Sequence, residues 1–229
     1  MTHLVIILSM PSGVDNANGD IAMGPTMPSI VTQGAAVSMP SARERLLRIL
    51  IETQSFKSSP TPSFPLASGA LSSFYIDCKI GLSYPEVRQV VGDLMLDRIE
   101  SPSVDAVGGL LIGAYPIAIA VSDAAYRRTG QVLRVFVVRK EAKEHGLKKV
   151  IEGDVVTGHS VVVVDDVITS GKSTVEAIRR SRAAGLTVTQ AIAIVDREEQ
   201  DGRNNIQAEG IRFDALCTLR DLRTAAEGR

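Results

Sequence analysis

The chain has 229 residues, is 45% hydrophobic, and carries a formal net charge of −1. This balance excludes the strongly basic surface of a nonspecific nucleic-acid-binding protein, and no apolar run approaches the roughly 18 residues of a membrane span. The two cysteines, Cys78 and Cys217, have neither metal-ligand spacing nor disulfide density, so we expect a cytoplasmic protein. Length and composition predict one globular domain with a sizeable core.

The first forty residues differ from the rest of the chain. Residues 11–40 contain no Lys or Arg and show no sustained helical or strand period. We therefore interpret residues 1–40 as a mostly disordered extension, with Met39 as an alternative initiator. The folded domain is expected to cover residues 41–229.

A helix is predicted to begin at Ser41, because Ser41 and Glu44 have the spacing of a capping box. Its apolar face consists of Leu46, Leu47, Leu50 and Ile51. A proline-rich connection follows, and the alternation in residues 72–80 (SSFYIDCKI) predicts a strand in which Cys78 is a packed thiol. Residues 85–99 form the next predicted helix.

The remainder of the chain alternates between strand and helix patterns. Residues 104–130 predict a strand, a glycine-rich turn and a helix, with Pro116 in its first turn and Gly130 past its end. The further predicted elements are strands at 132–140, 161–164 and 188–196 and a helix from Thr174 to Ala184, followed by Gly185. This order predicts an α/β fold with a doubly wound, mostly parallel sheet and flanking helices. Ligands are expected at the carboxyl ends of its strands.

Residues 161–174, VVVVDDVITSGKST, end like a Walker A loop, but Asp166 stands where that pattern requires glycine. Backbone N–H groups at the start of the following helix, with the hydroxyls of Thr169, Ser170 and Ser173, can surround a phosphate. Asp165 and Asp166 can accept hydrogen bonds from vicinal ribose hydroxyls or lie near hydrated Mg²⁺. The stretch therefore predicts a site for a ribose 5-phosphate. The alternative is a capping cluster with two solvated acids.

This stretch resembles the phosphoribosyl-pyrophosphate (PRPP) signature of type I phosphoribosyltransferases, which implies that fold, with a small N-terminal hood over the sheet. Lys172 departs from the small residue more usual at its position. By the family's roles, Asp165 and Asp166 hold the ribose hydroxyls and the loop holds the 5-phosphate. The PRPP-binding residues implied within this stretch are Asp165, Asp166, Val167, Ile168, Thr169, Ser170, Gly171, Lys172 and Ser173.

A second stretch, VRKEAKEHG at residues 138–146, concentrates positive charge after a predicted strand. A solvated charged turn is the ordinary explanation of such a run. The departure of pyrophosphate, however, calls for a mobile cationic loop. The stretch resembles the catalytic loop of orotate phosphoribosyltransferases, which implies a homodimer whose loop reaches the neighbouring subunit's site. The PRPP-binding cations that it implies are Arg139, Lys140, Lys143 and His145, with Lys143 catalytic beside Asp165 and Asp166.

Three further segments resemble the same family. Residues 66–79 resemble the segment that closes over orotate, and residues 194–199 resemble the strand end whose arginine, here Arg197, meets the orotate ring. A guanidinium suits carboxylate and imide oxygens, although an ion pair with a neighbouring acid is the structural alternative. Thr169 is implied as a second orotate-binding residue. Residues 109–118 occupy the position of the pyrophosphate loop, with Gly113, Ala114 and Tyr115 at its turn.

One departure from the family concerns the segment around Ser68 and Gly69. Many relatives have a lysine or arginine within or beside this motif, whereas this chain has Ala67, Ala70 and Leu71. A cation that contacts orotate is therefore missing from this segment. Lys79 is nearby in sequence, but as a strand residue it need not point into the site.

The resemblance covers residues 41–223 and predicts an orotate phosphoribosyltransferase: orotate and PRPP give orotidine 5′-monophosphate and pyrophosphate, with Mg²⁺ as cofactor. Mg²⁺ is expected near Asp165 and Asp166 through PRPP and water, without a direct protein ligand assigned. One alternative is a purine or other-base phosphoribosyltransferase, disfavoured by the cationic loop. Another is a PRPP-sensing regulator of the same fold, which usually needs a DNA-binding domain or a basic face. We expect no nucleic-acid or membrane partner.

Overall fold

A six-stranded sheet lies at the centre of the computed structural model, which describes residues 40–65, 71–140 and 150–228. Its strands are β5 (Ala106–Leu110), β6 (Arg134–Val138), β7 (Ile151–Gly153), β8 (Ser160–Ile168), β9 (Thr187–Asp196) and β10 (Arg212–Thr218). Their order is β10-β9-β8-β5-β6-β7, and only β7 runs antiparallel to its neighbour. The predicted mostly parallel sheet is confirmed.

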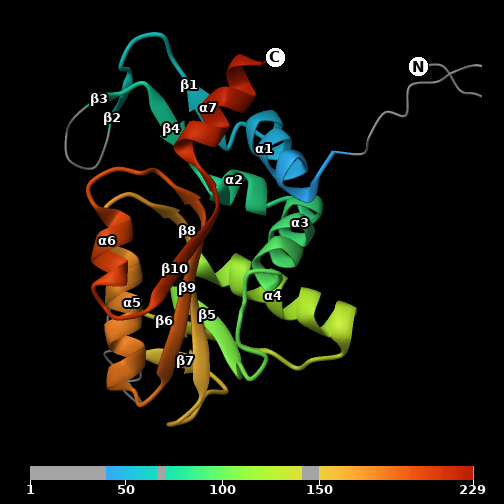
Figure 1. The fold of residues 1–229 in the computed structure, drawn as a ribbon, viewed down its shortest axis with the longest axis vertical. Coiled ribbons are helices and arrows are strands. Elements are labelled where there is room, and N and C mark those ends of the chain that lie inside the picture. Colours follow the sequence, from blue (N-terminus) through green and yellow to red (C-terminus); the bar gives the residue numbers. More distant parts are fainter. Residues whose placement is uncertain (1–39, 66–70, 141–149, 229) are drawn as a thin grey trace, which may run out of the picture. The chain divides into compact units, whose positions relative to one another are not determined.

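Helices cover both faces of this sheet (Figure 1). They are α1 (Ala42–Glu52), α2 (Cys78–Leu82), α3 (Pro85–Leu96), α4 (Ala114–Thr129), α5 (Lys172–Ala183), α6 (Gly202–Gln207) and α7 (Leu219–Glu227). One core cluster combines residues of α1, α3, α4 and α7 with one sheet face, and a second combines α5 and α6 with the other. The doubly wound arrangement follows from these two cores.

The four-valine run of β8 shows how the two cores share one strand. Val161 and Val163 belong to the core under α5, whereas Val162 and Val164 belong to the core under α4. Successive side chains of a strand point to opposite faces, and β8 continues to Ile168. The next two residues, Asp165 and Asp166, are therefore directed to opposite faces of the sheet.

The N-terminal part begins as predicted and then departs from the prediction. Ser41 caps α1, and its capping box with Glu44 is formed. The expected strand over residues 72–80 is wrong in its second half, since β4 (Phe74–Ile76) ends before Asp77. The Asp77 carboxylate accepts a hydrogen bond from the backbone N–H of Lys79 and caps α2, so a helix replaces the strand.

The hood, defined as the short strands β1 (Phe56–Ser58), β2 (Phe64–Pro65), β3 (Leu71–Ser72) and β4, consists of two antiparallel pairs. Phe56 and Phe74 stack within it, at 6.2 Å between ring centroids. The guanidinium carbon of Arg223, on α7, lies 4.9 Å from the centre of the Phe74 ring. The C-terminal helix thus helps to hold the hood.

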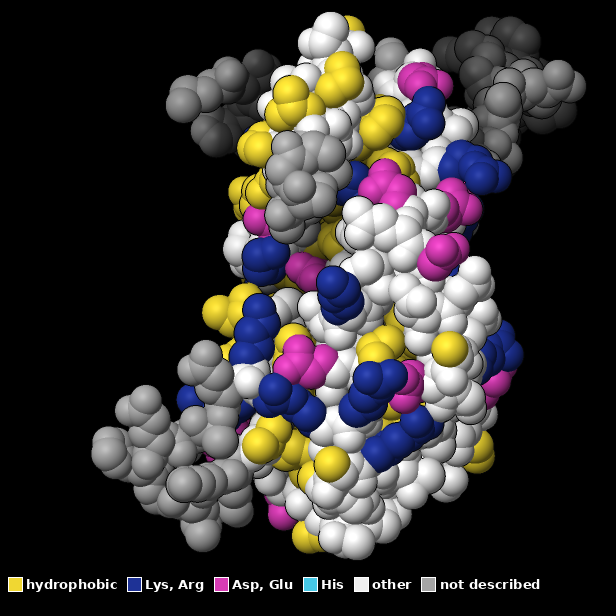
Figure 2. Space-filling model, turned by 90° about the vertical axis from the view of Figure 1, so that its left-hand side faces the viewer, with side chains coloured by type: hydrophobic (Ala, Val, Ile, Leu, Met, Phe, Trp, Pro, Cys, Tyr) yellow, Lys and Arg dark blue, Asp and Glu magenta, His cyan; other side chains and the backbone are white. Residues whose placement is uncertain are grey.

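Charged side chains of both signs cover the outer helices, and Figure 2 shows them interleaved on one face. On α5, Arg180 pairs with Glu176 at 2.6 Å, and Arg179 pairs with Glu209 at 2.7 Å. Among the described residues, no helix combines the length and apolarity that a membrane span requires. The predicted extension, residues 1–40, lies outside the described residues except for Pro40.

Candidate active site

The two aspartates of β8 have different surroundings. Asp165 is only 7% exposed, and the Thr174 hydroxyl at the start of α5 donates to its Oδ2 at 2.7 Å. The backbone N–H of Asp166 donates to its Oδ1 at 3.0 Å. Burial, together with the charge of Asp166, raises the pKa of Asp165 to about 7. Asp165 is thus a buried carboxyl that titrates near neutral pH.

Asp166 faces α2 and the turn before α4. Its Oδ2 accepts a hydrogen bond from Nζ of Lys79 at 3.4 Å. Its Oδ1 lies against Gly113, where a Cβ atom would come within 2.7 Å of it. The predicted pyrophosphate turn and the predicted ribose carboxylate are therefore in contact, and this contact requires glycine at position 113.

The predicted phosphate loop, residues 169–173, runs from the end of β8 into the first two residues of α5. Gly171 has a left-handed backbone (φ 72°), and a Cβ there would come within 2.8 Å of the Gly202 carbonyl oxygen. The amide of Asn205 donates to the Ser170 carbonyl at 3.0 Å. Helix α6 therefore braces the loop from behind, while no described side chain caps α5 and its first N–H groups remain available to an anion.

The side chains around this loop differ in what they can contact. Lys172 and Ser173 are exposed, whereas the Ile168 side chain is 1% exposed and belongs to the core. The Ile168 carbonyl accepts from the N–H of Arg197 at 2.9 Å. Of the implied PRPP contacts, Ile168 can therefore offer no side-chain contact, and its backbone belongs to the parallel ladder with β9.

A cavity of 480 Å³ lies beside the pyrophosphate turn and is lined by Leu111, Ile112, Arg139 and Lys140. The N–H of Leu111 donates to the Val138 carbonyl at 2.9 Å, which joins the ends of β5 and β6 at this point. Nη1 of Arg180 donates to the Arg139 carbonyl at 2.6 Å. The structure thus brings the first two predicted cations next to the Gly113 turn, while Lys143 and His145 lie outside the described residues.

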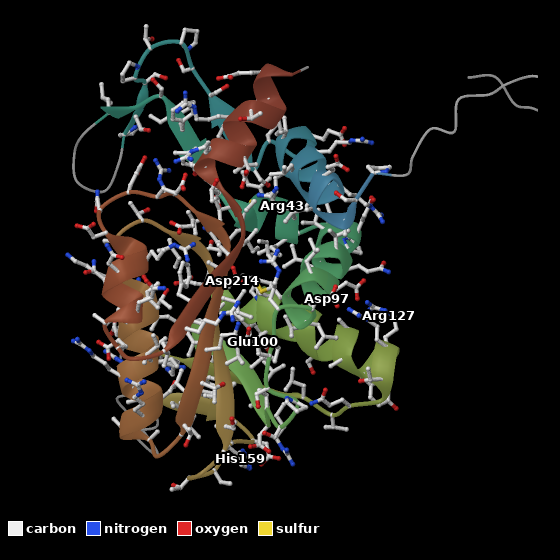
Figure 3. The ribbon with its side chains drawn as sticks, viewed as in Figure 1. Arg43, Asp97, Glu100, Arg127, His159 and Asp214 are labelled. Carbon is white, nitrogen blue, oxygen red and sulfur yellow. The ribbon has the colours of Figure 1, made fainter. Side chains whose placement is uncertain are left out.

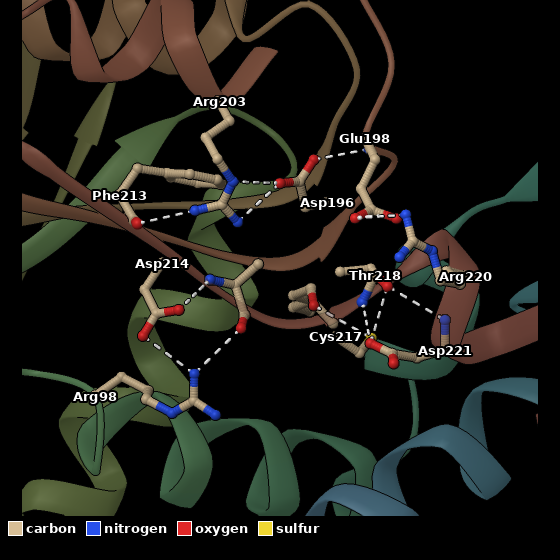
Figure 4. Close-up of polar contacts among 12 residues, drawn as sticks. Arg98, Asp196, Glu198, Arg203, Phe213, Asp214, Cys217, Thr218, Arg220 and Asp221 are labelled. Carbon is tan, nitrogen blue, oxygen red and sulfur yellow. Dashed lines mark hydrogen bonds and ion pairs between the residues drawn. The ribbon is translucent and has the colours of Figure 1, made fainter. Parts of the chain in front are cut away.

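Arg197 follows β9, but its side chain is 6% exposed and its guanidinium is paired with Glu199. Nε lies 2.9 Å from Oε2 of Glu199, and Nη2 lies 3.3 Å from Oε1. The ion pair considered as the structural alternative is therefore formed in this state. Figure 4 shows that the neighbouring acids face other arginines, since Asp196 pairs with Arg203 and Glu198 with Arg220.

Sequence reasoning missed two groups of this site. Lys79 was expected on a strand, without reason to face the site, yet it stands on α2 and contacts Asp166. Glu199 was not singled out, although it holds Arg197. The signal for Lys79 was the cap formed by Asp77. Ala67 and Ala70 lie outside the described residues. The one histidine that the structure describes, His159 (labelled in Figure 3), stands directly before β8, whereas Asp165 and Asp166 lie near the other end of that strand.

The match to known families agrees with this geometry. Residues 82–211 match the phosphoribosyl transferase domain, which is more than half of the chain. Fold and site together thus define a phosphoribosyl transferase.

Similar proteins show which family of phosphoribosyl transferases the chain belongs to. The chain is 42% identical to the orotate phosphoribosyltransferase of Aquifex aeolicus over 180 residues, which cover 79% of this chain and 97% of that protein. The orotate phosphoribosyltransferase of Mycobacterium tuberculosis, solved with Fe(III) dicitrate, superposes with a TM-score of 0.68 at 32% identity, over 79% of this chain and 98% of that chain. A structure of the same enzyme with PRPP gives 0.63 at 27% identity, over 81% and 93% of the two chains. The chain belongs to the orotate phosphoribosyltransferase family, a group of glycosyltransferases, as the sequence predicted.

Proposed function

We propose that the chain transfers ribose 5-phosphate from PRPP to orotate, giving orotidine 5′-monophosphate and pyrophosphate in pyrimidine (UMP) biosynthesis. The observation that supports this most directly is the arrangement around the end of β8. Asp166 lies against the Gly113 turn on one face, and the phosphate loop, residues 169–173, leads into α5 on the other. A phosphate site and a diol site so placed suit a ribose 5-phosphate.

The ribose is held, in this proposal, by Asp165 and Asp166, and the 5-phosphate by the loop at the start of α5. Displacement at C1 of the ribose passes through an oxocarbenium-like transition state, as in glycoside chemistry. Such a reaction needs no protein nucleophile. It needs a fixed sugar, a fixed acceptor and neutralisation of the leaving group.

We assign neutralisation of the leaving pyrophosphate to the cationic side chains. Arg139 and Lys140 line the cavity beside the Gly113 turn. Lys143 and His145 follow in the same segment and would add charge as pyrophosphate departs. We assign Lys143 the catalytic role because the RKEAKEHG stretch carries the family's loop pattern.

The described residues fit a magnesium ion that arrives with the substrate. Among them, no three His, Cys, Asp or Glu side chains could hold a metal ion together. Asp165 is engaged by Thr174 and Asp166 by Lys79. Mg²⁺ would therefore be held by PRPP oxygens and water, with Asp166 beside that water. When bound, it would help to neutralise the pyrophosphate charge.

Orotate is assigned to Arg197, with Thr169 as a second contact. A guanidinium has more donors than its pair with Glu199 uses, so Arg197 can remain on Glu199 and still donate to a carboxylate or imide oxygen. Glu199 then fixes the direction of the guanidinium.

We further propose a cytoplasmic homodimer in which the segment containing Lys143 acts in the neighbouring subunit's site. The RKEAKEHG stretch supports the shared loop, and two free, buried cysteines are consistent with a reducing compartment.

The proposed reaction can be tested by following the absorbance of orotate in the presence of PRPP and Mg²⁺. Adenine, hypoxanthine and uracil serve as competing acceptors under the same conditions. Consumption of orotate alone is the expected result. Turnover of a purine in place of orotate, or of no base at all, would contradict the proposal.

A further inference from the structure

The contact between Lys79 and Asp166 joins two parts of the chain that are 87 residues apart in sequence. Lys79 stands on α2, directly after the hood, and Asp166 stands on β8 of the central sheet. Its Nζ lies 2.7 Å from Oδ1 of Asp77 and 3.4 Å from Oδ2 of Asp166. One ammonium group thus bridges a carboxylate of the hood side and a carboxylate of the proposed ribose site.

The position of Lys79 is well determined by its surroundings. Asp77 caps α2, and its own N–H donates to the Ser55 carbonyl at 2.8 Å. Cys78, the first residue of α2, is completely buried. A Cβ on Gly81 would come within 2.7 Å of the Ser55 hydroxyl, so α2 packs closely on the chain that enters β1. The backbone of Lys79 therefore has little freedom.

The surroundings of Lys79 also stabilise its positive charge. Partial burial opposes it, but the hydrogen bond to Asp77 and the charge of Asp166 outweigh that effect and raise the pKa of Lys79. The side chain is still 48% exposed, so it borders the open side of the site. A permanent positive charge consequently stands beside Asp166 over the whole working pH range.

The Asp166 carboxylate has three contacts. Its Oδ1 accepts a hydrogen bond from the backbone N–H of Val167 at 2.9 Å and lies against Gly113, and Lys79 donates to its Oδ2. Without the ammonium, Oδ2 would lose this hydrogen bond, and the charge of Lys79 would no longer offset the negative charges of Asp166 and Asp165. A carboxylate that must accept hydrogen bonds from ribose hydroxyls depends on both its charge and its direction.

We propose that Lys79 is a positioning residue for PRPP: it orients Asp166 toward the ribose and is itself anchored by Asp77. This inference rests on the proposed function, because it assigns Lys79 to the ribose side of the same site. It also assigns Lys79 to PRPP rather than to orotate.

The test measures PRPP binding by isothermal titration calorimetry in the presence of Mg²⁺, together with the Michaelis constants of both substrates. Lys79→Met should weaken PRPP binding about tenfold, the loss of one charge-assisted contact, while the orotate Michaelis constant stays near the wild-type value. Lys79→Arg should restore most of the loss. Lys57→Met, in strand β1 of the same hood, is the matched control and should bind PRPP like the wild type.

Two further variants separate positioning from packing. Asp77→Asn retains a good helix cap but removes the anchoring charge, so it should weaken PRPP binding less than Lys79→Met does. In an Asp166→Asn background, Lys79→Met should cost less than about threefold, because the partner through which it acts is gone. Unfolding midpoints of all variants should match their parents.

Several results would overturn the inference. An equal loss from Lys79→Met with and without Asp166 would show that Lys79 does not act through this carboxylate. A rise in the orotate Michaelis constant alone would assign Lys79 to the base instead. Unchanged PRPP binding in Lys79→Met would remove the role altogether. If the wild type does not turn over orotate and PRPP, the proposed function itself is wrong. That result differs from the three above, which concern only the Lys79 variants.

Discussion

Glu199 holds the guanidinium of Arg197 through two hydrogen bonds, of 2.9 Å to Nε and 3.3 Å to Nη2. Both residues follow β9, whose end borders the phosphate loop, since the N–H of Arg197 donates to the Ile168 carbonyl. The pair therefore places a nearly buried cation at the carboxyl end of the sheet, where ligands of such folds bind.

Arg197→Ala should raise the Michaelis constant of orotate by roughly 10- to 100-fold and leave that of PRPP near the wild-type value, because a charge-assisted contact to one ligand is lost. Glu199 is 35% exposed, so water can solvate it in the variant. Steady-state kinetics with each substrate varied separately provides the measurement. Equal weakening of both substrates would show that Arg197 has a structural role.

Gly113→Ala tests the contact between the turn and Asp166. The added Cβ would lie 2.7 Å from Oδ1 and 2.9 Å from Cγ of Asp166, so the carboxylate must move. The backbone of Gly113 is helical (φ −61°, ψ −41°), so alanine itself is tolerated. We expect PRPP to bind about tenfold more weakly, with little change in the unfolding midpoint.

Gly228→Ala is the matched control for this substitution, since its Cβ would meet only the Thr224 carbonyl oxygen at an ordinary 3.5 Å. Both binding and stability of the control should equal those of the wild type. Wild-type PRPP affinity in Gly113→Ala would mean that the ribose does not depend on the direction of Asp166.

The sequence contained enough information for the four strands β5, β6, β8 and β9 of the central sheet and for the acids of β8. Four valines in a row required burial on both faces, and the strand's period then directed Asp165 toward α5 and Asp166 toward α2. The resemblance gave Arg139, Lys140 and Gly113, which line or border one cavity. Local pattern was sufficient for these strands and for the helices α1, α3, α4 and α5 between them.

Other elements were harder to predict, for physical reasons. Residues 72–80 alternate like a strand, but the side chain of Asp77 bonds to the backbone and begins a helix instead. The three residues of β7 and the strand β10 depend on pairing with β6 and β9, which a local pattern does not encode. Glu199 was missed because pairing with Arg197 depends on the loop after β9, which has left-handed residues at Glu198 and Asp201.

Asp165→Asn should stabilise the protein in buffer without PRPP or Mg²⁺. The folded-state pKa of Asp165, about 7, is raised above the ordinary value of 3.8, so ionising this carboxyl opposes folding. That cost is absent below pH 3.8, grows as the pH rises toward 7 and is constant above 7. Asparagine removes it, and the gain is at most about 4 kcal/mol.

Urea unfolding at pH 5 and pH 8 checks this prediction. The gain of the Asp165→Asn variant should be larger at pH 8 than at pH 5. Thr174 can still bond to the amide, so packing should change little. An equal change at the two pH values would attribute the effect to packing, and a gain only at pH 5 would reverse the assigned direction.

Deletion of residues 1–38 should leave the unfolding midpoint and the turnover number unchanged. Helix α1 closes its own first turn, because Ser41 and Glu44 bond to each other and need nothing upstream. Ser41→Ala in the shortened chain should cost about 1 kcal/mol, as the loss of an N-cap does. A large loss of stability or turnover on deletion alone would show that the extension packs on the domain.

Lys143→Ala should lower the turnover number by roughly two to three orders of magnitude, typical of losing one preorganised charge contact. A second inactive variant combines Asp165→Asn and Asp166→Asn. When the two variants are mixed, dissociated and reassorted, a hybrid dimer has one site with intact aspartates and an intact partner lysine. Half of the randomly paired dimers are hybrid, so about a quarter of wild-type activity should return if the loops are exchanged across a twofold axis. Mass spectrometry of differently tagged subunits shows independently whether subunits have exchanged. If they have exchanged and no activity returns, Lys143 acts in the site of its own subunit.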